Sequence, residues 1–187
     1  MSTSARKLQG PASVPEPPIS RFLFADTRLS WLWLLLRVWL GWQWLTAGWN
    51  KVGASAWTGE NAGAAVRGFL SGALEKELPG WYAWFIENLA LPNAPVFGWL
   101  VAYGEVLVGI ALILGALTGI AAFFGTLMNL AFLFAGTVSS NPLMFVVGTW
   151  LVLAWRNAGW YGLDRWLLPA LGTPWQPGYL LRSEAEK

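Results

Sequence analysis

The chain has 187 residues, of which 56% are hydrophobic and only 12% are charged. A soluble domain carries about 25% charged residues, so this composition excludes a hydrated surface without large apolar patches. The net charge of +2 and the lack of a basic run interleaved with aromatic residues exclude a nucleic-acid partner. The chain contains neither cysteine nor histidine, so we expect no disulfide, no thiolate nucleophile, no metal and no haem. Redox chemistry would therefore need an organic cofactor or a partner subunit.

Residues 1–28 are polar and contain four prolines and four basic residues. This composition predicts a largely disordered cytoplasmic segment. It contains no short apolar stretch that ends in a small-residue cleavage site, so we expect no removable signal peptide.

Four apolar runs follow, each close in length to a transmembrane helix. About 20 residues at 1.5 Å per residue match the ~30 Å hydrocarbon core of a bilayer. Four such runs in one small chain leave nothing but lipid to cover them. We therefore predict an all-α fold, a four-helix transmembrane bundle within residues 29–158, with spans at about 29–48, 96–115, 118–136 and 142–157.

The connection between the first two spans, residues 49–95, is long, whereas the next two connections are short. Within it, apolar residues recur at helical spacing from Ala62 to Ala73, and a shorter apolar stripe follows Pro79-Gly80. Both stripes predict amphipathic helices that lie on the membrane surface or cap the bundle. The two short connections predict antiparallel neighbours.

Basic residues set the expected orientation. They flank the first span on its N-terminal side and the fourth span on its C-terminal side, whereas those of the long loop are diluted by glutamates. The positive-inside rule places both termini in the cytoplasm and the long loop outside. We expect a multi-pass protein of the plasma membrane, with residues 159–187 as a cytoplasmic interfacial tail.

Three of the predicted spans place a strongly polar residue at similar depth, namely Arg37, Glu105 and Asn129. Counting from the span ends, they lie about 12–17 Å from the cytoplasmic face. An isolated charge at such depth costs about 2.5–3.5 kcal/mol. We therefore expect Arg37 to pair with Glu105, with Asn129 nearby, either as a structural lock or as a functional site.

Each polar residue shares a helix face with small residues, which let helices approach closely. The three stripes are Arg37, Gly41, Trp44, Gly48 and Lys51; Gly98, Ala102, Glu105 and Gly109; and Gly125, Asn129, Phe132 and Gly136. These faces are expected to converge. Asn141-Pro142 opens the fourth span, where Asn141 either caps the helix or helps Lys51 to receive an anion from outside.

Residues 104–119, GEVLVGIALILGALTG, resemble the signature of the DoxX/DoxD family of membrane proteins. Shorter resemblances lie at Arg37, Gly48 and Lys51, at Met128-Asn129 and at Tyr161–Pro169. The resemblance runs from about Leu29 to Trp175. It implies similarity to the DoxD-type subunit of thiosulfate:quinone oxidoreductase, which oxidises thiosulfate to tetrathionate and reduces a membrane quinone. Other relatives are associated with redox-homeostasis complexes.

Two hypotheses follow. In the first, the chain is a quinone-coupled oxidoreductase subunit, with Glu105, Arg37 and Asn129 as catalytic candidates and Lys51, Asn141, Trp44 and Arg67 as substrate-binding candidates. In the second, it is a non-catalytic membrane scaffold that assembles a redox-homeostasis complex. The partners expected are the lipid bilayer, a quinone, a small sulfur anion, and a partner subunit or a second copy of the chain. A small-anion transporter is disfavoured, since no inverted repeat or broken helix pair is evident.

Overall fold

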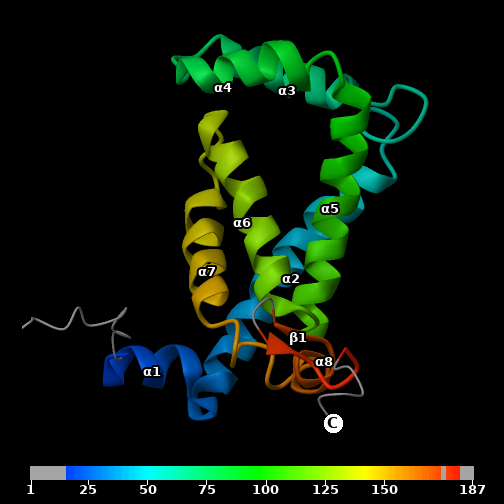
Figure 1. The fold of residues 1–187 in the computed structure, drawn as a ribbon. Helices are drawn as coiled ribbons and strands as arrows, with labels where there is room; N and C mark the ends of the chain where they lie inside the picture. Colours follow the sequence, from blue (N-terminus) through cyan, green and yellow to red (C-terminus); the bar gives the residue numbers. More distant parts are fainter. Residues whose placement is uncertain (1–15, 174–175, 182–187) are drawn as a thin grey trace, which may run out of the picture.

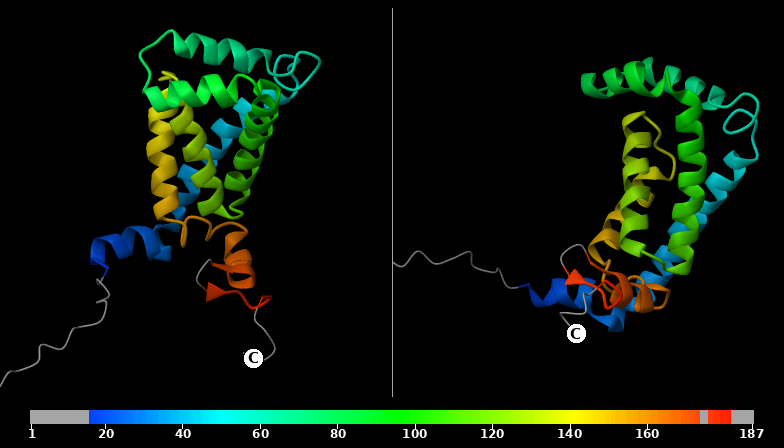
Figure 2. Two further views of the ribbon diagram at one scale, coloured as in Figure 1. Left: turned by 45° about the horizontal axis from the view of Figure 1, so that its top comes forward. Right: turned by 45° about the vertical axis from the view of Figure 1, so that its right-hand side comes forward.

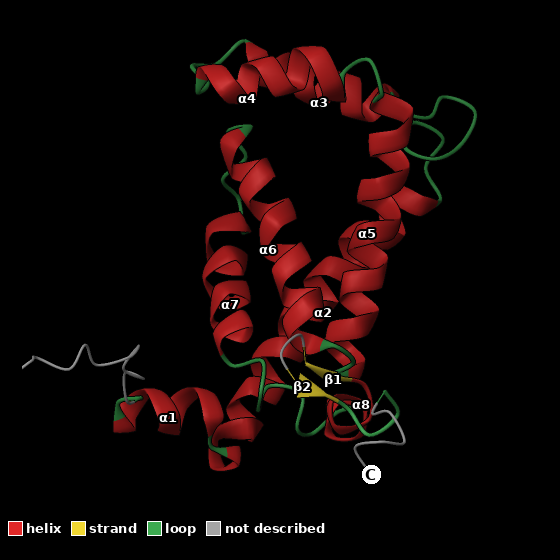
Figure 3. Cartoon of the chain, viewed as in Figure 1, coloured by secondary structure: helices red, strands yellow, loops and turns green. Residues whose placement is uncertain are grey.

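The computed structural model describes residues 16–173 and 176–181, and this part of the chain is helical apart from two short strands (Figures 1 and 3). In chain order the elements are α1 (Pro18–Ala25), a 3₁₀ turn (Thr27–Leu29), α2 (Ser30–Val52), α3 (Ala64–Leu74), α4 (Gly80–Phe85), a π-helical turn (Ile86–Ala90), α5 (Ala94–Leu114), α6 (Thr118–Phe134), α7 (Asn141–Leu153), α8 (Asp164–Leu171), β1 (Gly172–Thr173) and β2 (Gln176–Pro177). The two strands pair antiparallel after α8.

The long helices α2, α5, α6 and α7 pack side by side (Figures 1 and 2). The most extensive contact joins α2 to α5, followed by that between α6 and α7. The helices α3 and α4 lie across one end of this group, and α1 and α8 lie at the opposite end (Figure 1). We call these the α3–α4 end and the α1–α8 end.

The long helices fall on the four apolar runs of the sequence, and α3 and α4 fall on the two stripes between the first pair. The largest differences are four residues each: α2 continues beyond Gly48 to Val52, and α7 ends at Leu153, whereas the fourth span is predicted to reach residue 157. Among the described helices, α5 alone has both the length and the apolar composition needed to cross a membrane. The helices α6 and α7 are apolar but shorter.

Three glycines set the close contact between α2 and α5. A methyl group on Gly48 would lie 2.7 Å from Val106 N, and one on Gly41 would lie 2.9 Å from the carbonyl oxygen of Gly109. The predicted small-residue stripes therefore do face each other. These contacts also fix the antiparallel register, which brings the end of α2 beside the middle of α5.

Replacing Gly109 by Ala should destabilise the fold by about 1–3 kcal/mol, as expected for overpacking. The added methyl group would lie 2.5 Å from the backbone nitrogen of Leu45. Gly68→Ala in α3 is the matched control, because nothing lies within 4 Å of its added methyl group, and it should be neutral or stabilise by about 0.5–1 kcal/mol. Thermal unfolding in one detergent compares the two variants, and equal Tm values would contradict this account of the interface.

The α3–α4 end is held to the long helices by an apolar cluster and by hydrogen bonds. The buried cluster includes Val66 and Leu70 of α3 and Tyr82 of α4. The hydroxyl of Tyr82 donates to Ala131 O at 2.7 Å near the end of α6. Burial raises the pKa of Tyr82, so its hydroxyl remains a neutral donor. This end therefore covers the long helices as a packed layer.

The N-terminal region departs from the sequence-based expectation of disorder over residues 1–28. Residues 1–15 lie outside the described residues, but Pro18–Ala25 forms α1, so the expectation is wrong there. Pro18 suits the first helical turn, and the end of α1 is held to the long helices. Trp33 Nε1 and Asn157 Nδ2 both donate to the carbonyl oxygen of Leu23, at 2.9 and 3.2 Å.

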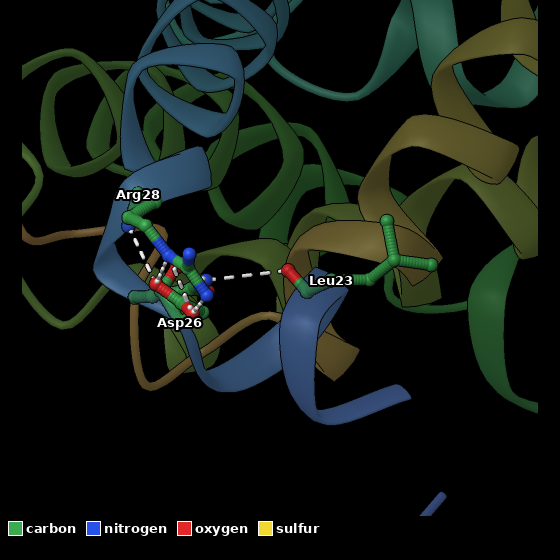
Figure 4. Close-up of polar contacts among 4 residues, drawn as sticks. Leu23, Asp26 and Arg28 are labelled. Carbon is green, nitrogen blue, oxygen red and sulfur yellow. Dashed lines mark hydrogen bonds and ion pairs between the residues drawn. The ribbon is translucent and has the colours of Figure 1, made fainter. Parts of the chain in front are cut away.

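The turn after α1 carries a local ion pair between Arg28 and Asp26, with an N–O distance of 2.6 Å (Figure 4). The hydrogen bonds from Arg28 hold the pKa of Asp26 below its usual range. Asn157 Nδ2 also donates to Asp26 O at 2.9 Å. Hydrogen bonds from Asn157 thus hold the turn to the segment that follows α7.

Candidate functional site

A buried ion pair joins the end of α2 to the middle of α5. Lys51 Nζ lies 2.6 Å from Glu105 Oε2, and the side chains are 21% and 2% exposed. Lys51 Nζ also donates to Ala47 O at 3.3 Å and lies 5.1 Å from the centroid of the Trp57 ring. The ammonium thus has two hydrogen-bond acceptors and one aromatic ring face around it. The pair is electrically neutral as it stands.

A cavity of about 490 Å³ adjoins this pair at the α3–α4 end. Its volume lies within the range of small-molecule sites. It is lined by Gln43, Trp44, Thr46, Ala47, Asn50, Lys51, Trp57, Phe69, Glu105, Phe132, Thr137, Ser139, Ser140, Asn141 and Met144. The wall is mainly apolar and aromatic, with one cation, one carboxylate and a few amides and hydroxyls. That combination suits a flat ligand with polar edges.

Three helices contribute aromatic side chains to the wall, in addition to Trp57. Trp44 of α2 is buried, and its ring centroid lies 6.4 Å from that of Phe132 of α6. Phe69 of α3 meets Phe132 edge-on at 6.3 Å. Because α3 contributes to this contact, the layer at the α3–α4 end forms part of the cavity wall.

Four polar residues around the start of α7 also line the cavity. They are Thr137, Ser139, Ser140 and Asn141. Ser139 has φ of +36°, a backbone conformation uncommon for a residue other than glycine. Asn141 Nδ2 donates to Thr137 O at 3.1 Å, so a local hydrogen bond uses one of the two N–H groups of this amide.

The expected pairing of Arg37 with Glu105 is wrong. Arg37 is 1% exposed and its guanidinium contacts the end of α5 instead. Its Nη1 donates to Leu112 O and Ile113 O at 2.6 and 2.7 Å, and its Nη2 donates to Tyr161 O at 2.8 Å. The carbonyls of Leu112 and Ile113 lie in the last turn of α5, where the acceptors of a helix lack their usual intrahelical partners.

The physical reason is the helix register. Since α2 runs to Val52 and packs antiparallel to α5, Lys51 lies opposite Glu105. Arg37, nearly four turns earlier on α2, then meets the C-terminal end of α5. A cation there interacts favourably with the helix dipole.

Asn129 is fully buried on α6, and neither of its side-chain polar atoms has a hydrogen-bond partner among the described residues. It lies one turn from Phe132 but does not line the cavity. Arg67 of α3 is exposed and also lies outside the wall. The cavity thus brings together Glu105, Lys51, Trp44 and Asn141, and leaves Arg37, Asn129 and Arg67 elsewhere.

Sequence reasoning missed several contributors. Gln43 and Asn50 line the cavity, and their spacing of seven residues on the same side of α2 as Ala47 was a usable signal. Trp57 lies in the irregular segment before α3 and gave no periodic signal. Asp164 was also missed. Its carboxylate accepts from Leu117 N and Thr118 N at 2.5 and 2.8 Å and so caps α6 from a distant part of the chain.

The surface of the long helices is apolar, whereas charged groups lie inside. Glu105 and Arg37 are buried, while Leu107, Ile120 and Phe123 are more than half exposed. These features define a small helical membrane protein with a mainly apolar cavity beside a buried ion pair. A family model described as DoxX matches residues 32–138, more than half of the chain, which therefore belongs to the DoxX family. Comparison with curated proteins and with solved structures gives no match.

Proposed function

We propose that the protein is a multi-pass subunit of the plasma membrane that binds a quinone in the cavity beside Lys51 and Glu105. It couples quinone reduction to the oxidation of a small sulfur anion, for which thiosulfate is the candidate. The observation that carries this proposal is the cavity itself, which combines aromatic walls with a buried lysine–glutamate pair.

The membrane part of the proposal is supported by the distribution of apolar residues. The helix α5 is long and apolar enough to span a bilayer, and α2, α6 and α7 lie alongside it (Figure 2). Large exposed apolar side chains on these helices suit lipid as solvent. The positive-inside rule then places the α1–α8 end, with its arginines, in the cytoplasm and the cavity on the outer side.

The cavity offers contacts for both reactants. Trp44, Phe69 and Phe132 supply ring faces and edges for stacking the flat ring of a quinone. Lys51 is the cation that holds the sulfur anion, and Glu105, the one carboxylate among the described residues of the wall, is the proton carrier. Overall, two thiosulfate ions and one quinone with two protons give tetrathionate and quinol. The chain lacks cysteine, so electrons pass between bound reactants without a protein persulfide.

Arg37 takes no part in that chemistry. Its hydrogen bonds hold the far end of α5, so it is a positioning residue for the helix pair that carries Lys51 and Glu105. Asn129 is a buried amide with both polar atoms unpaired among the described residues, and it is retained as a candidate contact for a ligand that passes Phe132.

Reduction of a short-chain quinone analogue, followed optically with purified protein, tests the proposal. We expect turnover with thiosulfate, less with sulfite and none without a donor. Glu105→Gln should lower turnover by at least about 100-fold, as for the loss of a general acid–base group. Gly68→Ala is the control, because Gly68 does not line the cavity and nothing lies within 4 Å of its added methyl group. Folded protein without turnover on any donor would contradict the enzyme proposal for this chain.

The second candidate is a scaffold subunit. Its support is that Lys51 and Glu105 satisfy each other at 2.6 Å and that Trp81 and Trp84 of α4 are more than 60% exposed at the α3–α4 end. On this alternative the ion pair only fixes the register of α2 on α5, and a partner protein docks on α4.

A further inference from the structure

We propose that an anion binds Lys51 only together with one proton, which Glu105 takes up as it releases the lysine. This inference rests on the proposed function, because it takes the cavity to be the site where the sulfur anion binds. It adds the condition under which that anion binds, namely the uptake of one proton by Glu105.

Glu105 already neutralises the charge of Lys51. The ammonium lies 2.6 Å from Glu105 Oε2, 3.3 Å from Ala47 O and 5.1 Å from the centroid of the Trp57 ring. An anion that approaches this ammonium from the cavity therefore meets an ionised carboxylate beside it. The carbonyl and the ring carry no net charge and do not repel an anion. The carboxylate carries a charge of the same sign as the anion, and its Oε2 lies 2.6 Å from Lys51 Nζ. The anion and the ionised carboxylate exclude each other.

Glu105, in turn, has no other partner. Lys51 is its only hydrogen-bond donor among the described residues, and its side chain is 2% exposed. A carboxylate that loses its partner in a buried site is strongly destabilised. Its protonated form has no charge to solvate and can donate its own hydrogen to an oxygen of the anion.

Among the described residues, no other charged group near Glu105 can take the place of Lys51. On α2, Arg37 is bound to carbonyls at the opposite end of α5. The helices α6 and α7 contain no ionisable residue. On α3, which packs on α5, Arg67 is exposed. Within the cavity wall, Lys51 and Glu105 are the only ionisable groups.

The charge balance follows directly. The free site holds one positive and one negative group and is neutral. A dianion without a proton would leave the site with a charge of minus two, and the accompanying proton reduces this to minus one. The proton comes from solvent on the side of the cavity and stays on Glu105, where reduction of a quinone consumes it. Anion binding thus loads the proton carrier before any electron moves.

Calorimetry with wild-type protein in detergent tests this. Thiosulfate is titrated at one near-neutral pH in two buffers that differ in their enthalpy of ionisation, which gives the number of protons taken up. We expect one proton per anion, and an apparent Kd that rises about tenfold for each unit of increase in pH. Glu105→Gln should bind without proton uptake and with no dependence on pH, while Gly68→Ala should behave as wild type.

Different results would contradict the inference and the proposed function. Thiosulfate binding without proton uptake, and with a Kd independent of pH, overturns the inference and leaves the anion site in place. No thiosulfate binding by folded wild-type protein overturns the anion part of the proposed function, and the inference with it. If Glu105→Gln does not fold, the two-buffer titration of the wild-type protein decides alone.

Discussion

Replacing Lys51 by Met should destabilise the fold by about 3–5 kcal/mol, the usual effect of removing one member of a buried ion pair. Glu105 is 2% exposed and would remain inside the protein without its partner. Glu105→Gln should cost less, about 1–3 kcal/mol. In that variant the unpaired group is Lys51, which is 21% exposed and lies at the end of a helix, where a lysine can extend toward water.

The double variant, Lys51→Met with Glu105→Gln, should regain much of the stability lost in Lys51→Met alone. Removing both charges leaves no uncompensated ion, and apolar or neutral replacements of a buried pair are often tolerated. Unfolding in detergent of the wild type, the two single variants and the double variant gives the coupling energy. Additive losses would show that Lys51 and Glu105 do not act as a pair.

The same cycle separates the two candidate functions. A folded double variant without quinone reduction, beside an active wild type, supports a site that performs chemistry. A folded double variant that still assembles with a partner subunit, beside a wild type that shows no turnover, supports the scaffold function. The double variant therefore tests function as well as stability. We expect the fold to tolerate removal of the ion pair and quinone reduction to be lost without it.

The sequence predicted the elements well, because apolar length and small-residue spacing are local signals. The stripes through Gly41 and Gly48 and through Gly109 do meet at the closest helix contact. The same stripes contained both Lys51 and Arg37, so they gave two candidate partners for Glu105. Choosing between them needed the register of α2 on α5, which is a tertiary property.

The wrong choice came from the end of the first apolar run. Hydropathy ends that run at Gly48, whereas the helix continues through the polar residues Asn50 and Lys51 to Val52. Four residues correspond to about one helical turn, or 6 Å, and this additional turn of α2 carries Lys51, whose Nζ lies 2.6 Å from Glu105. The cavity also uses Trp57 and Phe69, whose positions depend on how the segment between α2 and α5 folds back.

Replacing Arg37 by Met should prevent most of the protein from accumulating in the folded state. The guanidinium makes three hydrogen bonds to buried or partly buried carbonyls, and bonds to a charged group contribute about 1.5–3 kcal/mol each. Arg28→Met is the matched control. The Arg28 side chain is 76% exposed, and water screens its ion pair with Asp26, so its loss should hardly change stability.

Arg37→Lys should rescue little, because one ammonium cannot reproduce the planar fork that spans two carbonyls of α5 and one of Tyr161. Gly162→Ala should reproduce part of the defect without touching the charge, since its methyl group would lie 2.9 Å from Arg37 Nη2. Yield of monodisperse protein and Tm measure both effects. If Arg37→Met folded with the wild-type Tm but lost quinone reduction, Arg37 would belong to the chemistry after all. We expect the reverse, with stability lost first and activity falling in proportion to the folded fraction, because Arg37 contacts the end of α5 and not the cavity.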